Sequence, residues 1–256
     1  MNQLKRRLAA GEVTTAFMVT MPSVTMVQLL AASGVDCLIL DLEHGQIDQP
    51  TLHAMIAATR GSAATPIVRL PWMEPWLAKP VLDAGAFGLC FPMVSNAEQA
   101  AATVRAIRYP PKGERGLAPG YAPARWGMAM PDYLKVADGE LINMITIEQP
   151  EAVERLDEIL AVPGIDAAAI AIWDLTMCLG VPGQRDHPEV RRLTEVAERK
   201  ILEAGISLCG IAPDTKAAEE MAERGYRMLL LGFDVQLVQG AAAQALQRVP
   251  RATSGS

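Results

Sequence analysis

The sequence predicts a single α/β domain folded as a (β/α)8 or TIM barrel, and two observations carry that prediction. Short apolar runs recur eight times along the chain, and a segment with helical spacing of its apolar residues follows each run. The chain has 256 residues, close to the usual length of one such barrel, and no domain linker interrupts the rhythm. We expect one barrel domain over residues 1–250 and a disordered tail over residues 251–256.

The expected strands are rich in branched apolar side chains, which is typical of a parallel sheet buried on both faces. They lie at residues 15–20, 37–41, 66–70, 88–92, 141–148, 167–174, 207–212 and 228–232. A doubly wound open sheet is the alternative, but it normally carries a glycine-rich turn after its first strand. Here that turn is Thr20-Met21-Pro22-Ser23, which favours the barrel.

The expected helices end at residues that favour helix termini. Gly11, Gly34 and Gly85 each follow a helical segment, where glycine commonly ends a helix. The helices are expected at residues 3–10, 24–32, 49–60, 75–84, 96–108, 150–160, 189–204, 214–224 and 235–247. The stretch 109–139, rich in Pro, Gly and Arg, is expected to be irregular, and loops of this length are usually lids, binding loops or oligomer contacts.

The composition excludes several classes of partner. The formal net charge is −6, and no basic stripe marks a nucleic-acid surface. No window reaches the roughly 20 apolar residues of a membrane span, and residues 1–11 lack the apolar core of a signal peptide. Zinc-site spacing is absent from Cys37, Cys90, Cys178 and Cys209, so we expect buried, reduced thiols in a cytoplasmic protein.

Ionisable residues stand at the carboxyl ends of four neighbouring strands. The second strand runs into Asp41-Leu42-Glu43-His44-Gly45, the third ends in Arg69, and the fifth and sixth end in Glu148 and Asp174. Burying unpaired charges is costly, and the carboxyl ends of barrel strands form the mouth that carries catalysis. The sequence therefore predicts a polar site at that mouth.

Glu148 and Asp174 suit a divalent cation such as Mg2+ or Mn2+, which takes one or two protein carboxylates and leaves positions for substrate oxygens. The alternative is that both carboxylates cap helices or pair with arginine. Phosphate loops, dinucleotide fingerprints and serine-hydrolase elbows are absent from the sequence. The pattern favours a metal-assisted reaction on a small oxygenated substrate.

Two further residues complete this candidate site, each with a structural alternative. Arg69 can stabilise an oxyanion or form an ion pair with Asp41 or Glu43. His44 suits proton transfer because its unperturbed pKa is near neutrality, or it is an ordinary polar residue of the mouth. Beside a metal held by the fifth and sixth strands, Asp41 and Glu43 would order water or support the metal-binding groups from behind.

These residues resemble the metal-dependent class II pyruvate aldolases, the 4-hydroxy-2-oxoheptanedioate aldolase and citrate-lyase β-like family. The likeness extends from about residue 3 to residue 248. It rests on Asp41-Leu42-Glu43-His44-Gly45, Val68-Arg69, Leu82-Asp83-Ala84-Gly85-Ala86, Pro92-Met93-Val94, Arg108-Tyr109-Pro110-Pro111-Lys112-Gly113, Arg115-Gly116, Ile147-Glu148, Asp174-Leu175, Leu179-Gly180 and His187-Pro188-Glu189-Val190.

The resemblance implies a role for each residue of the site. Glu148 and Asp174 would hold Mg2+, Mn2+ or Co2+, and Arg69 would stabilise an enolate. His44 would transfer protons with Asp83 as its partner, and Asp83 enters by resemblance alone. The substrate would meet Arg69, Trp173 and Asp174.

The resemblance also implies a reaction and an assembly. The family cleaves 4-hydroxy-2-oxo acids to pyruvate, or an analogue such as hydroxypyruvate, plus an aldehyde, and it catalyses the reverse aldol addition. Its barrels exchange the C-terminal helix between subunits in a homohexamer, a trimer of dimers. The alternatives are a carbon–carbon lyase of the citrate-lyase type acting on a coenzyme A thioester, and a non-catalytic barrel that binds 2-oxo acids.

The chain departs from the family pattern near the expected metal site. Ala171-Ile172-Trp173 stands where relatives have a Gly-Pro pair and a small residue before the aspartate. Thr146 stands where a glutamine is common. We expect activity to persist with an altered donor or acceptor preference.

Overall fold

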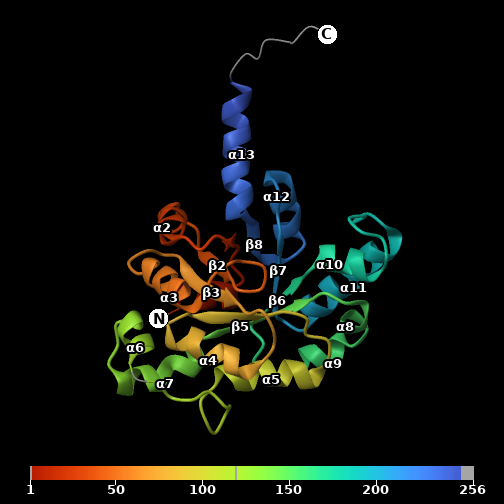
Figure 1. Ribbon diagram of the computed structural model, residues 1–256. Helices are drawn as coiled ribbons and strands as arrows, with labels where there is room; N and C mark the ends of the chain where they lie inside the picture. Colours follow the sequence, from red (N-terminus) through yellow and green to blue (C-terminus); the bar gives the residue numbers. More distant parts are fainter. Residues whose placement is uncertain (1, 119, 249–256) are drawn as a thin grey trace.

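In a computed structural model, which describes residues 2–118 and 120–248, eight parallel strands form a closed barrel (Figure 1). Every strand pairs with its neighbours in sequence, and β1 pairs with β8. The strands are β1 (Thr14–Val19), β2 (Cys37–Asp41), β3 (Thr65–Arg69), β4 (Gly88–Phe91), β5 (Ile142–Ile147), β6 (Ala167–Ile170), β7 (Ser207–Ile211) and β8 (Tyr226–Phe233). The predicted barrel fold is confirmed.

Helices surround the barrel and connect its strands (Figure 1). They are α1 (Gln3–Ala9), α2 (Val24–Ala32), α3 (Gln49–Ala58), α4 (Pro75–Asp83), α5 (Ala97–Ile107), α6 (Tyr121–Trp126), α7 (Met130–Glu140), α8 (Pro150–Glu154), α9 (Leu156–Leu160), α10 (Ile172–Cys178), α11 (Pro188–Glu203), α12 (Thr215–Glu223) and α13 (Asp234–Gln247). Within the described ranges, none of these helices is both long and apolar enough to cross a bilayer.

Alternate strand residues fill two separate cores. The barrel interior holds side chains such as Ile39, Ile67 and Met144, and Leu4 and Leu8 of α1 pack with them. The opposite faces of the strands pack against the outer helices in a second, larger cluster. Because side chains alternate between the two cores, Asp41 and Arg69 continue the inward-facing rows of β2 and β3 up to the mouth.

Four expectations from the sequence are corrected. The stretch 109–139 contains α6 and most of α7 instead of being irregular throughout, and the helix expected at 150–160 is divided at Arg155 into α8 and α9. The sixth strand ends at Ile170, so Asp174 lies in the first turn of α10 and not at a strand end. Cys178 is exposed, whereas Cys37, Cys90 and Cys209 are buried and free as expected.

The C-terminal helix α13 leaves the barrel instead of packing against it (Figure 1). Its first residue, Asp234, is buried and accepts hydrogen bonds from the backbone of Thr20 (3.0 Å) and Met21 (2.9 Å). All described residues from Val235 onward are exposed. The tail expected to be disordered, residues 251–256, lies outside the described ranges.

Candidate active site at the mouth of the barrel

The turn after β2 is held in place by the Asp41 side chain and by Gly45. The Asp41 Oδ1 atom accepts the backbone N–H groups of Glu43 (3.0 Å) and His44 (3.4 Å). A Cβ atom on Gly45 would collide with the carbonyl oxygens of Asp41 and Thr20. Glycine is therefore required at position 45, and it lets the turn fold tightly against the end of β1.

Arg69 is locked in place by Asp41, its partner in the strand register. The Arg69 Nε and Nη2 atoms donate to the two Asp41 carboxylate oxygens at 2.8 and 2.7 Å, a bidentate pair in which Asp41 is fully buried. Burial opposes the charge of Arg69, but the hydrogen bonds and charge of Asp41 outweigh it and raise the pKa of Arg69 above its usual range. The ion-pair alternative considered for Arg69 is thus realised.

Glu43 faces the same guanidinium with one oxygen left open. Its Oε2 atom lies 3.1 Å from Arg69 Nη1, yet it is buried and has no hydrogen-bond partner in the described chain. Burial raises the pKa of Glu43; Arg69 opposes this rise, and the nearby charge of Glu148 adds to it. The mouth thus holds a buried carboxylate oxygen that is paired with Arg69 by charge but accepts no hydrogen bond in the described chain.

His44 stands at the rim of the mouth. Its side chain is 68% exposed, and its Nε2 atom lies 3.9 Å from Glu43 Oε2. An exposed imidazole beside a carboxylate is free to meet a ligand and to exchange protons with solvent.

Glu148 follows directly after β5, and its charge acts on Glu43 after β2. It is 9% exposed, and the Thr146 hydroxyl donates to its carboxylate while lying 3.2 Å from the carbonyl oxygen of Phe91. Thr146 therefore orients Glu148. Glu148 also raises the pKa of Glu43 by its charge, so the two carboxylates share one electrostatic environment.

Asp174 approaches from α10 and is exposed. Its charge and that of Glu148 both raise the pKa of the Cys178 thiol, after the larger effects of burial and Glu151. Within the described residues, no group of three or more His, Cys, Asp or Glu side chains is arranged to hold a metal ion. A cation here would therefore have two protein carboxylates, with water or substrate oxygens completing its coordination.

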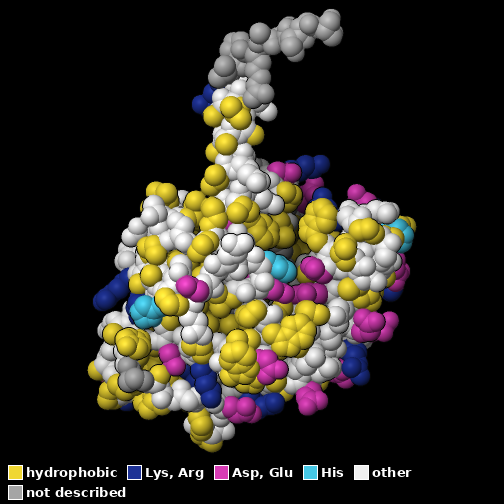
Figure 2. Space-filling view, viewed as in Figure 1, with side chains coloured by type: hydrophobic (Ala, Val, Ile, Leu, Met, Phe, Trp, Pro, Cys, Tyr) yellow, Lys and Arg dark blue, Asp and Glu magenta, His cyan; other side chains and the backbone are white. Residues whose placement is uncertain are grey.

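The chemistry of these donors fits a hard divalent cation. Asp41, Glu43, Glu148 and Asp174 bring four carboxylates to a mouth whose central cation is Arg69, already paired with Asp41. Figure 2 shows a histidine and several acidic side chains near the middle of this face, among apolar ones. Such an excess of negative charge in a partly desolvated site favours binding of a divalent cation.

Asp83, expected beside His44, lies elsewhere within one chain. It ends α4, and its Oδ1 atom accepts a hydrogen bond at 3.3 Å from Arg115, whose side chain is fully buried. Burial raises the pKa of Asp83, with Arg115 opposing the shift. No hydrogen bond or ion pair joins Asp83 to His44 in the described part of the chain.

Trp173 has a neighbour that the sequence did not reveal. The Arg185 guanidinium lies 5.1 Å from the centre of the Trp173 ring, and the Thr176 hydroxyl accepts the backbone N–H of Gly183 at 3.0 Å. The loop after α10 is thus folded back over the residue that precedes Asp174. Neither helical nor strand periodicity links positions 173 and 185, so only the fold brings them together.

Comparison with known proteins finds a matching family and similar aldolases. The profile of the HpcH/HpaI aldolase/citrate lyase family matches residues 16–241. The chain is 36% identical over 247 residues to the hydroxypyruvate/pyruvate aldolase of Roseovarius nubinhibens, covering 96% of both chains. It is 37% identical over 248 residues to the 2-keto-3-deoxy-L-rhamnonate aldolase of Escherichia coli, covering 96% of this chain and 92% of that one. An HpcH/HpaI family structure from Burkholderia cenocepacia has a TM-score of 0.90 at 32% identity, covering 97% of this chain and 99% of that one.

Proposed function

The chain belongs to the HpcH/HpaI aldolase/citrate lyase family and is an aldolase, a carbon–carbon lyase; from this premise we propose that it cleaves 4-hydroxy-2-oxo acids with the help of a divalent cation. The products would be pyruvate, or hydroxypyruvate, and an aldehyde, and the reverse aldol addition would use the same site. The proposal is supported by two carboxylates near the fixed Asp41–Arg69 pair: Glu148 directly follows β5, Asp174 lies in the first turn of α10, and the charges of both act on Cys178.

Glu148 and Asp174 would hold Mg2+, Mn2+ or Co2+ in this site, and the bound cation would act as a Lewis acid on the 2-oxo group. Arg69 would contribute a fixed positive charge next to the same oxygen, because Asp41 prevents it from turning away. Trp173 would line the approach of the substrate beside Asp174. The open Oε2 atom of Glu43 would accept a hydrogen bond from an ordered water.

His44 would take the proton from the 4-hydroxyl group as the carbon–carbon bond breaks, and return it in the reverse reaction. Its exposure at the rim leaves the imidazole accessible to that hydroxyl. Because Asp83 of the same chain faces Arg115, we propose that His44 pairs with Asp83 of a second copy of the chain.

The exposed helix α13 supports an assembly of several copies. Val235, Leu237, Val238 and Leu246 remain exposed along it, although a stable helix normally buries such residues. A hollow of about 850 Å³ opens nearby, lined by apolar residues such as Ile211, Met221 and Phe233 and by charged ones such as Glu198 and Arg224. We propose that α13 is exchanged between subunits of a hexamer, which multi-angle light scattering would test against a Val238→Glu, Leu246→Glu variant.

The activity is tested by measuring pyruvate or hydroxypyruvate release from a panel of 4-hydroxy-2-oxo acids. The protein is assayed as purified, after stringent chelation, and after addition of Mg2+, Mn2+ or Co2+. We expect activity to disappear with chelation and to return with the cation. Full activity after chelation would refute the metal-assisted mechanism, and turnover only of a coenzyme A thioester would favour the citrate-lyase type of reaction.

A further inference from the structure

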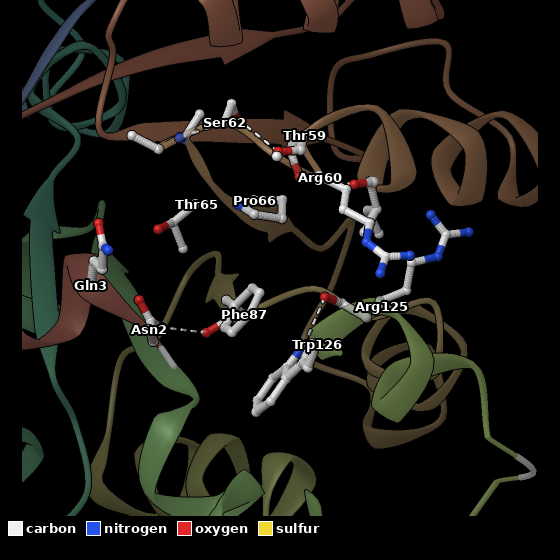
Figure 3. Close-up of a pocket in the computed structure, with 15 residues that line it drawn as sticks. Asn2, Gln3, Thr59, Arg60, Ser62, Thr65, Pro66, Phe87, Arg125 and Trp126 are labelled. Atoms are coloured by element: carbon white, nitrogen blue, oxygen red, sulfur yellow. Dashed lines mark hydrogen bonds between the residues drawn. The ribbon is translucent and has the colours of Figure 1, made fainter. Parts of the chain in front are cut away.

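Another pocket lies where β3 begins, at the end of the barrel opposite to the mouth; Figure 3 shows the residues that line it. Its volume is about 440 Å³, within the usual range for small-molecule sites. It is lined by the start of α1, the end of α3 and the turn after it, the start of β3, the segment before β4 and α6, including Arg60, Pro66, Phe87, Arg125 and Trp126. Thr65 and Pro66 begin the strand that ends in Arg69, so this pocket is separate from the acidic mouth.

The side of the pocket formed by α6 is firmly built. The stem of Arg125 lies over Gly85, where a Cβ atom would come within 2.7 Å of Arg125 Cβ. Trp126 Nε1 donates to the Gly85 carbonyl oxygen at 3.1 Å, and the Trp126 ring stacks on Phe87 at 4.3 Å with an interplanar angle of 5°. These contacts fix Arg125 above an apolar, aromatic wall.

Two arginines meet at the edge of the pocket without an acidic partner. Figure 3 shows the Arg60 and Arg125 side chains directed to the same side, and burial together with the charge of Arg60 lowers the pKa of Arg125. No carboxylate lies within ion-pair distance of either guanidinium in residues 2–118 and 120–248. The contact that Arg125 does make is a hydrogen bond from Nη2 to the His53 Nε2 atom at 2.7 Å, which requires that nitrogen to be unprotonated.

We propose that this pocket binds a small oxyanion that carries an apolar or aromatic body. The anionic oxygens would bridge the guanidinium groups of Arg60 and Arg125 and offset their repulsion. The body of the ligand would pack on the Phe87–Trp126 stack. The hydroxyls of Thr59 and Ser62 donate to backbone carbonyl groups, and the two arginines are the charged donors among the residues that line the pocket. A recessed pocket of this size favours a small molecule over an acidic segment of another protein.

The experiment is isothermal titration of the full-length protein with phenyl phosphate, inorganic phosphate and the neutral analogue benzyl alcohol at fixed ionic strength. We expect phenyl phosphate to bind about tenfold more tightly than phosphate and benzyl alcohol not to bind. Arg60→Ala should weaken phenyl phosphate binding about tenfold or more. Arg199→Ala, the matched loss of an exposed arginine on α11, should leave binding unchanged.

A second variant guards against misfolding around α6. Arg60→Glu places a carboxylate beside Arg125, so it should abolish binding while raising the melting temperature through the new ion pair. Equal binding by the wild type, Arg60→Ala and Arg60→Glu would overturn the proposal, because the anion would then be bound elsewhere, for example at the mouth. Absence of any phenyl phosphate binding to the wild type would also overturn it.

Discussion

The two sides of the barrel mouth differ in how their charges are held. On the β2–β3 side, Asp41 is fully buried and Arg69 is 14% exposed, and the two are joined by two short hydrogen bonds. On the β6–α10 side, Asp174 is exposed and Trp173 beside it is 51% exposed. The first side is organised by the fold itself. On the second side, a bound ligand has to fix the positions of the charged groups.

This difference separates two kinds of contribution to catalysis. A charge fixed before the substrate arrives costs no reorganisation during the reaction, and it stabilises the transition state more effectively for that reason. Exposed groups can adapt to different ligands, which suits the choice of substrate. We therefore expect substitutions on the β2–β3 side to alter stability and activity together, and those on the β6–α10 side to alter activity alone.

The largest effect is expected for Arg69→Met, which leaves the buried Asp41 carboxylate without its charged partner. Breaking a buried ion pair in this way costs about 3–5 kcal/mol in the free energy of unfolding, and aldol cleavage should be lost as well. Chemical denaturation measures the stability. Arg185→Met is the matched control, since Arg185 is exposed and should change stability by less than about 0.5 kcal/mol. Similar losses for both variants would remove the distinction between the two sides.

The next effect concerns the two proposed metal-binding residues, of which Glu148 directly follows β5 and Asp174 lies on α10. Glu148→Gln and Asp174→Asn should each lower kcat/KM by about a thousandfold or more, because each removes a charged ligand of the proposed cation. Asp174→Asn should leave the melting temperature of the chelated protein unchanged, since its carboxylate is exposed. Activity assays over a range of Mn2+ concentrations would measure the loss of metal affinity. Wild-type kinetics in either variant would place the metal elsewhere.

The sequence was most informative where charge interrupts an apolar strand. Asp41 and Arg69 end inward-facing rows, so strand periodicity alone brings them together at the mouth. The end of β6 was misplaced because Ala167–Ile172 is apolar throughout, and nothing in it marks the change from strand to helix. Both α6 and α7 were missed because Pro and Gly in and around them resemble loop composition. Tertiary contacts such as the Trp126–Phe87 stack stabilise this region, and they are invisible in the sequence.

A pH-dependent effect is expected at Glu43, which faces both sides of the mouth. Its pKa is raised from 4.5 in the folded chain, mainly by burial, so folding favours its protonated form. Stability from this group is fully present below its unfolded pKa and is lost as the pH rises through the folded pKa. The Glu43→Gln variant does not undergo this loss, so its free energy of unfolding should rise relative to that of the wild type above about pH 4.5. Urea denaturation of the chelated protein from pH 4 to pH 8 measures the difference, and parallel curves would contradict it.

The smallest effect is expected for Trp173→Ala, and it tests the adaptable side directly. The exposed ring, stacked by Arg185, stands next to Asp174 without filling a core. Its removal should therefore change the free energy of unfolding by less than about 1 kcal/mol. It should also change the relative kcat/KM for aldehydes of different size by about three- to tenfold, favouring larger ones. Arg185→Ala retains the ring but frees it, so a smaller change in the same direction is expected. If kcat/KM instead changes by the same factor for all aldehydes, Trp173 acts through Asp174 and not by contact with the substrate. The β6–α10 side would then not adapt to the substrate, and in this respect it would resemble the Asp41–Arg69 pair.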